Sequence, residues 1–161
     1  MTAEASLRVK IQYFASRYIT SPGPHKFFYR LTGGLIGSRL PGVNPRVLLL
    51  TVTGRKSGKL RTSPMVYWRD GERLVVVGSN NGKDQHPSWY WNLKTNPRAT
   101  VQTGRDKLPV TAEEAAGEER ERLWKKVTEN HPLFAEYQRR TSRQLPVFIL
   151  TPAGDGEAGD V

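Results

Sequence analysis

From residue 46 onward, the chain alternates short apolar runs, rich in β-branched residues, with clusters of turn residues. Such runs predict strands, and connections this short require neighbouring strands to pair antiparallel. The predicted strands are residues 47–53, 62–68, 73–79, 99–103, 108–112 and 145–151. Asp70 and Gly71 predict a tight turn, and Pro109, which lacks a backbone N–H, predicts that its strand lies at an edge. The pattern therefore predicts an α+β or mostly β fold, a small antiparallel barrel of about six strands with packed helices.

Helical signals follow residue 86. Pro87 is favoured in a first helical turn, and Trp89 and Leu93 fall on one face of the helix that it opens. Residues 113–129 predict a helix with a charged outer face, and residues 132–140 predict one or two further helical turns.

The charge of the chain is unevenly distributed. The 161 residues include 25 Lys and Arg against 15 Asp and Glu, which gives a net charge of +10. Residues 1–64 hold 11 of the basic side chains and one acid, so the whole excess lies there. A one-sided field of this kind indicates an anionic partner, such as a phosphate, a nucleic acid or an acidic lipid surface.

Three regions are predicted. Residues 1–42 form a basic N-terminal helical segment, residues 43–152 form the barrel domain, and residues 153–161 form a disordered tail. The amphipathic stripe of residues 7–19 allows two interpretations: it packs on the barrel, or it makes peripheral contact with anionic membranes. We find neither a signal peptide nor a membrane span, so a cytoplasmic location is expected, with membrane association as the second interpretation.

Residues 54–58, Gly-Arg-Lys-Ser-Gly, are the most informative loop. The glycines allow a tight turn whose N–H groups converge, while Arg55, Lys56 and Ser57, with Arg61 close behind, suit an oxyanion. The alternative is a solvated hairpin loop, in which basic residues and glycines are also common. The glycine spacing is not that of a phosphate-binding P-loop.

The run from His86 to Leu93 contains three consecutive aromatic residues. They cannot all face one core from a helix, so Trp89 is expected inward and Tyr90 or Trp91 elsewhere. An exposed aromatic side chain could stack on a planar ligand or a partner. The alternative is that neighbouring elements partly bury all three.

Several kinds of chemistry are excluded. The chain has 0 Cys, its 3 His are scattered, and no metal site is expected. It contains no G-x-S-x-G, no G-x-G-x-x-G and no paired catalytic carboxylates. If the protein is an enzyme, a bound organic cofactor is therefore expected to carry the reaction.

Four segments, in this order and spacing, resemble the deazaflavin-dependent nitroreductase family, a branch of the flavin/deazaflavin oxidoreductases of actinobacteria. They are LLLTVTGRKSG at 48–58, RTSP at 61–64, VVGSN at 76–80 and HPSWYWNLKTNP at 86–97. The resemblance covers about residues 40–152 and implies a split β-barrel that binds coenzyme F420, an 8-hydroxy-5-deazaflavin with a phospholactyl-oligoglutamate tail.

The resemblance also implies which residues hold the cofactor. The phosphate and tail carboxylates are assigned to Arg55, Lys56, Ser57 and Arg61. The ring and ribityl portion are assigned to Thr62, Ser63, Pro64, Val77, Gly78, Ser79, Asn80, Ser88, Trp89, Tyr90, Trp91 and Asn92.

Two departures from the family pattern bear on function. The family often has Lys where this chain has Asn80, so either a tail contact is missing or Lys83 replaces it. Tyrosines of the nitroimidazole-reducing members correspond to Val66, His131 and Phe134 here, and only Tyr137 fits that pattern. The less hydroxylated pocket argues against nitroimidazole drugs as substrates.

The resemblance implies an F420H2-dependent reductase that transfers a hydride to an electron-poor small molecule, such as a conjugated enone, quinone or nitro compound. Tyr137, His131, Ser79 or solvent would supply the proton. The alternatives are an FMN- or FAD-dependent oxidoreductase on the same barrel, with FMN as the second candidate cofactor, and a non-enzymatic module that binds an anion or lipid. A nucleic-acid partner is not expected.

Overall fold

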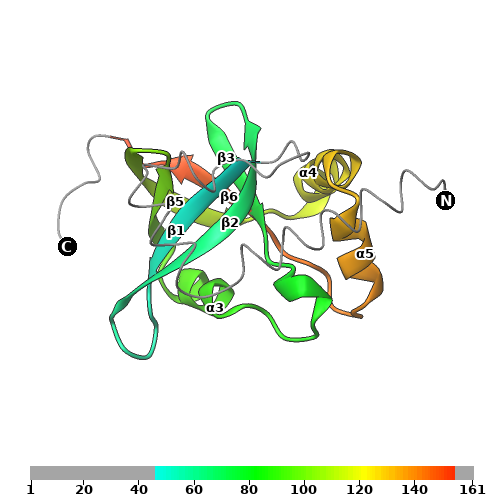
Figure 1. Ribbon diagram of the computed structural model, residues 1–161, viewed down its shortest axis with the longest axis horizontal. Coiled ribbons are helices and arrows are strands. Elements are labelled where there is room, and N and C mark those ends of the chain that lie inside the picture. Colours follow the sequence, from blue (N-terminus) through cyan, green and yellow to red (C-terminus); the bar gives the residue numbers. More distant parts are fainter. Residues whose placement is uncertain (1–45, 155–161) are drawn as a thin grey trace.

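The computed structural model describes residues 46–154, which form a closed six-stranded antiparallel barrel with three α-helices (Figure 1). The strands follow the order β1-β2-β3-β6-β5-β4 around the barrel. Their bounds are β1 Arg46–Thr53, β2 Leu60–Asp70, β3 Arg73–Val77, β4 Arg98–Thr103, β5 Asp106–Glu114 and β6 Val147–Pro152. The helices are α3 Ser88–Thr95, α4 Gly117–Asn130 and α5 Leu133–Arg139, and a short 3-10 helix, η1, spans Asn80–Gly82. The predicted split barrel is confirmed.

Two hydrophobic cores hold the barrel and its helices together. Alternate residues of each strand point to opposite faces of a sheet, so Leu74 and Val76 of β3 face inward, whereas Val75 and Val77 face outward. The inner core fills the barrel, and Trp89 and Leu93 of α3 complete it. The outer core lies between the sheet and the helices α4 and α5. Figure 1 shows α3 at one end of the barrel and α4 with α5 along its side.

The prediction that Pro109 lies on an edge strand is wrong. β5 pairs with β4 on one side and with β6 on the other, so the closed barrel has no edge there. Pro109 is tolerated because the pairing with β6 begins at the next residue, Val110. Its carbonyl accepts a hydrogen bond of ordinary length, 3.0 Å, from the Ala153 N–H. The missing N–H therefore falls at the end of a ladder.

Another difference concerns the start of α4. Glu113 and Glu114, predicted to open the helix, instead extend β5 opposite Ile149 and Phe148 of β6. The helix begins at Gly117, where φ is +55°. Acidic residues suit both the first turn of a helix and an exposed strand end, so their charge alone did not locate the boundary.

The predicted N-terminal helix of residues 7–19 lies outside the described residues. Residues 155–161 of the predicted tail also lie outside them. Within residues 46–154, no helix is long and apolar enough to cross a membrane.

Candidate functional site

The loop between β1 and β2 (residues 54–59, the β1–β2 loop) closes on itself through backbone hydrogen bonds. The Gly54 N–H donates to the Lys59 carbonyl at 2.9 Å, and the Gly58 N–H donates to the Gly54 carbonyl at 2.7 Å. Gly58 has φ of +66°, a left-handed conformation that glycine adopts without strain. The Ser57 hydroxyl accepts the Lys59 N–H at 3.3 Å. The loop thus holds Arg55 and Lys56 at the end of the barrel with exposed side chains.

One side chain joins this loop to α3. Asn92 is 6% exposed, and its Oδ1 accepts the backbone N–H of Arg55 at 3.1 Å. Trp89 lies one turn earlier on the same helix and packs edge-to-face on Phe148, with ring centroids 5.5 Å apart. The inner core therefore fixes α3, and α3 fixes the loop.

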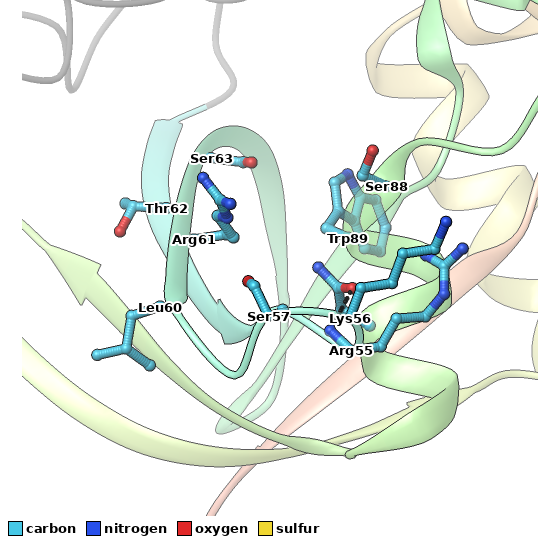
Figure 2. A pocket seen from close by; sticks show the side chains of 11 residues that line it. Arg55, Lys56, Ser57, Leu60, Arg61, Thr62, Ser63, Ser88 and Trp89 are labelled. Atoms are coloured by element: carbon cyan, nitrogen blue, oxygen red, sulfur yellow. Dashed lines mark hydrogen bonds between the residues drawn. The ribbon is translucent and has the colours of Figure 1, made fainter.

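Between the β1–β2 loop, the start of β2 and α3 lies a cavity of about 640 Å³. Its lining residues are Gly54, Arg55, Lys56, Ser57, Leu60, Arg61, Thr62, Ser63, Ser88, Trp89 and Asn92. In Figure 2, Ser63 points from β2 toward Ser88 and Trp89 on α3, while Leu60 and Thr62 point the other way. This alternation follows from the strand, since Arg61 and Ser63 share the face of their cross-strand partners Val52 and Leu50.

The cavity has a strongly positive character. Three cations line it, and none of the described lining residues is Asp or Glu. The ion pairs among residues 46–154 occupy other cations, and none of them involves Arg55, Lys56 or Arg61. The N-terminus of α3 adds the partial positive charge of a helix start, since Ser88 and Trp89 are its first residues. This donor set fits an extended anion with several oxygens.

A second loop, residues 78–87 (the β3–α3 loop), lies beside the cavity wall. A Cβ on Gly78 would come within 2.7 Å of Pro146 Cγ and 3.5 Å of Trp89, so only glycine fits there. Asn80 and Asn81 both have left-handed backbones, with φ of 46° and 58°. The His86 ring stacks on Tyr90 at 4.0 Å, and the Trp91 ring meets it edge-on at 5.6 Å.

Asn80 suits its position better than Lys would. Asn is among the residues that most readily adopt a left-handed backbone, and the Asn80 side chain donates from Nδ2 to the Gln85 carbonyl at 2.8 Å. Lys83, the predicted replacement for the family's lysine, is exposed, and its carbonyl accepts a hydrogen bond from Arg143 Nε at 2.9 Å. Its side chain is not among those lining the cavity.

Two of the predicted proton donors, His131 and Tyr137, lie in the outer core. Both are 2% exposed, and Phe134 contacts both rings, at centroid distances of 5.3 Å and 5.9 Å. Burial lowers the pKa of His131 from 6.5 to about 4. Among the described residues, His131 Nδ1 is the buried side-chain polar atom without a hydrogen-bond partner.

The cavity brings together nine of the residues that the sequence assigned to the cofactor: Arg55, Lys56, Ser57, Arg61, Thr62, Ser63, Ser88, Trp89 and Asn92. The others do not line it. Pro64 is half-buried on β2, and Val77 belongs to the outer core. The β3–α3 loop contains Gly78, Ser79, Asn80 and Lys83. Tyr90 is half-buried against His86, and Trp91 is 45% exposed.

Sequence reasoning assigned Gly54 to the tight turn of residues 54–58 and did not single out Leu60, and both residues also line the cavity. For Leu60, the available signal was its position between the predicted ligands Ser57 and Arg61. It also did not single out Arg143, whose guanidinium donates to carbonyls of the β3–α3 loop. Within residues 46–154, no three metal-ligating side chains come close enough together to hold an ion.

The barrel, with a cationic cavity at one end and the buried Trp89 in the cavity wall, defines the class of a split-barrel protein whose cavity suits an anionic organic ligand. Comparison with known families then identifies the group. The model of the F420H(2)-dependent quinone reductase family matches residues 24–152, and the chain belongs to this family. It is an oxidoreductase family, and its members depend on reduced F420, which does not support FMN as the cofactor. The match begins at residue 24, within the segment assigned above to residues 1–42.

Individual relatives agree with the family match. An F420H(2)-dependent quinone reductase of Mycobacterium tuberculosis is 42% identical over 130 residues, which cover 79% of this chain and 87% of the relative. The solved structure of an F420-H2 dependent reductase, FDR-A, is 47% identical with a TM-score of 0.60, covering 65% of this chain and 92% of that one. Another solved structure, a domain-swapped dimer, is 41% identical with a TM-score of 0.62, covering 78% and 92%.

Proposed function

We propose that this protein transfers a hydride from reduced F420 to a quinone, and that the cationic cavity holds the anionic tail of the cofactor. The observation that carries the proposal is the donor set of the cavity: three cations free of ion pairs with described residues, several hydroxyls and no carboxylate. F420 carries a phosphate and tail carboxylates, which such a set binds through charge-assisted hydrogen bonds. Other electron-poor acceptors, such as conjugated enones and nitro compounds, belong to the same proposal.

The residues of the cavity would divide the binding between them. Arg55, Lys56 and Arg61 are the groups for the phosphate and carboxylates, and Ser57 is a short donor among them. Ser63 and Ser88, which lie on opposite walls, suit the hydroxyls of a ribityl chain. Asn92 holds the Arg55 backbone through Oδ1, which leaves its Nδ2 group as a donor on the cavity wall.

When bound, reduced F420 supplies a hydride from its deazaflavin ring. The protein's own contribution is to bind the cofactor remotely through the tail and to orient the ring against the acceptor, with water excluded. The Trp89 side chain is fixed in the cavity wall, because it is 6% exposed and packs on Phe148. A fixed apolar wall of this kind restricts how a planar ring can lie.

The proton for the product is proposed to come from Ser79, Tyr137 or solvent. His131 is neutral near pH 7 because burial lowers its pKa to about 4, and neutral imidazole is a weak acid. Ser79 lies at the start of η1 and is half-buried, and it directly follows Gly78, where an added Cβ would lie 3.5 Å from the Trp89 ring. These positions favour Ser79 over His131 for a proton transfer near the cavity.

Fluorescence titration tests the proposal. Purified protein is titrated with oxidised F420 and with FMN, and the oxidation of reduced F420 is then followed with and without a soluble quinone. We expect F420 to bind at micromolar or lower concentration, FMN to bind much more weakly, and oxidation to depend on the quinone. FMN binding as tight as that of F420 would contradict the proposal.

The contact with anionic membranes stays a prediction about residues 7–19. If that segment binds membranes, full-length protein will co-sediment with anionic liposomes at low salt and a variant without residues 1–20 will not. Full-length protein that ignores such liposomes would contradict it.

A further inference from the structure

The β3–α3 loop is tied to a distant part of the chain, the connection between α5 and β6 (residues 140–146, the α5–β6 connection). The Gly78 N–H donates to the Pro146 carbonyl at 2.9 Å. The Thr141 hydroxyl, which is buried, donates to Asp84 Oδ1 at 2.8 Å. These ties join residues more than fifty positions apart in the sequence.

Arg143 makes most of the contacts between the two segments. Its Nη1 donates to the Gly78 carbonyl at 3.1 Å, its Nη2 to the Ser79 carbonyl at 2.9 Å, and its Nε to the Lys83 carbonyl at 2.9 Å. The guanidinium is half-buried and makes no ion pair with any described carboxylate. Its planar fork, with five N–H donors, suits three carbonyls that converge on one point.

A fourth contact of Arg143 is with His86, which lies in the β3–α3 loop just before the helix that forms the cavity wall. Nη1 lies 3.3 Å from His86 Nδ1. Because Arg has only donors, Nδ1 must accept, which places the single proton of neutral His86 on Nε2. His86 in turn stacks on Tyr90 and meets Trp91 edge-on, and both belong to the first turn of α3.

We propose that Arg143 is a positioning residue for the cofactor cavity: it fixes the β3–α3 loop and His86, and through them the start of α3 that carries Ser88 and Trp89. The loop needs such support because two consecutive non-glycine residues, Asn80 and Asn81, hold left-handed backbones. Arg143 itself is absent from the lining of the cavity, so its effect is indirect. The binding part of this inference rests on the proposed function.

Two lysine variants test the proposal. Arg143→Lys keeps the positive charge and loses the fork, whereas Arg139→Lys makes the same change at an exposed residue that pairs only with Glu136 among the described side chains. We expect Arg143→Lys to weaken F420 binding by about tenfold or more and Arg139→Lys to leave it unchanged. Added guanidinium should partly restore binding to Arg143→Ala, while an equal concentration of ammonium should not.

Nitrogen NMR of the His86 ring gives a readout that needs no cofactor. The wild-type ring should show one tautomer with the proton on Nε2, and Arg143→Lys should show a mixture. If the wild type does not bind F420, the proposed function fails and this measurement still decides the role of Arg143. If Arg143→Lys does not fold, Thr141→Val is the second variant, because it removes the hydrogen bond to Asp84 and the one that the Arg143 backbone N–H donates to the Thr141 hydroxyl. It keeps the Arg143 guanidinium and should weaken binding in the same direction by a smaller factor.

The proposal is overturned if folded Arg143→Lys binds F420 like the wild type. It is also overturned if the His86 ring keeps its single tautomer in that variant, or if both lysine variants lose binding equally. Where Thr141→Val replaces Arg143→Lys, wild-type affinity in Thr141→Val overturns it as well.

Discussion

Arg61 is the residue on which the cavity's interpretation depends most directly. It lines the cavity from β2 and makes no ion pair with a described carboxylate, so Arg61→Ala removes a cation without exposing a buried partner. A charge-assisted hydrogen bond contributes about 1.5–3 kcal/mol, so we expect F420 binding to weaken by about ten- to a hundredfold. The turnover rate at saturating cofactor should change little. Fluorescence titration and steady-state kinetics measure the two effects.

Arg105→Ala is the matched control for Arg61→Ala. Arg105 is exposed in the turn between β4 and β5 and is not among the residues lining the cavity. It should leave the affinity unchanged. Wild-type affinity in Arg61→Ala, with the fold verified by circular dichroism, would show that the β1–β2 loop and its flank are a solvated hairpin instead.

His131 predicts a pH effect on stability at the scale of one side chain. Its pKa falls from 6.5 to about 4 in the fold, so between these values the unfolded chain binds a proton that the folded chain does not. Stability should therefore decrease as pH falls from 6.5 toward 4, by about 3 kcal/mol at most for this shift. His131→Leu removes the titrating group and should flatten this slope in denaturant unfolding.

Stability at pH 8, where histidine is neutral in both states, serves as the reference for the His131 experiment. There His131→Leu should be as stable as the wild type or more so, because it removes a buried nitrogen without a hydrogen-bond partner. Equal slopes in wild type and variant between pH 6.5 and 4 would refute the assignment.

At the scale of elements, Asp70 joins the β2–β3 turn to α4. Its carboxylate accepts two hydrogen bonds from Arg122, at 2.9 Å and 2.8 Å, and further bonds from Arg73 and Lys126. The hydrogen bonds from Arg122 are the main reason that the pKa of Asp70 lies far below the ordinary 3.8, although burial acts in the opposite direction. Asp70→Asn should lower the free energy of unfolding by about 1–2 kcal/mol, since the partners are partly exposed.

Because the pKa of Asp70 is lower in the fold than in the unfolded chain, its contribution to stability depends on pH in the acid range. A carboxyl with a lowered pKa stabilises the fold above its ordinary value, and this contribution is lost as pH falls from 3.8 toward the lower folded value. Asp70→Asn should therefore show a smaller loss of stability in acid than the wild type. Glu72→Gln, an equal charge change at an exposed residue in the same turn, should follow the wild type.

The sequence predicted elements well where local patterns decide them. All six strands, α3 and the Asp70–Gly71 turn follow from periodicity and turn chemistry, both of which act over a few residues. Pro109 was misassigned because the order of strands in a closed barrel depends on contacts between distant segments.

The residues of the candidate site also differ in how far local sequence patterns can predict them. Arg55, Lys56, Ser57 and Arg61 are close in sequence and could be found as one motif. Arg143 could not, because a side chain that binds backbone carbonyls requires no particular partner residue type. The resemblance to a family supplied the cofactor, which no local pattern specifies.

At the scale of the whole molecule, the net charge of +10 should set how binding responds to salt. FMN carries one phosphate, whereas F420 adds several carboxylates, so the field favours F420 by long-range attraction as well as by contact. Salt screens exposed charges beyond about 8 Å at physiological ionic strength. Raising the salt from about 0.05 M to about 0.5 M should therefore weaken F420 binding by about tenfold and FMN binding by less.

A deazaflavin that lacks the phosphate and tail is the control for this effect, because it has the same ring and no tail charge. Its binding should hardly change with salt, and Arg61→Ala should show a shallower dependence for F420 than the wild type. If F420 and the tail-free deazaflavin respond to salt equally, ring contacts determine the affinity and the cationic cavity does not hold the tail. The uneven charge of residues 1–64 would then require a different anionic partner.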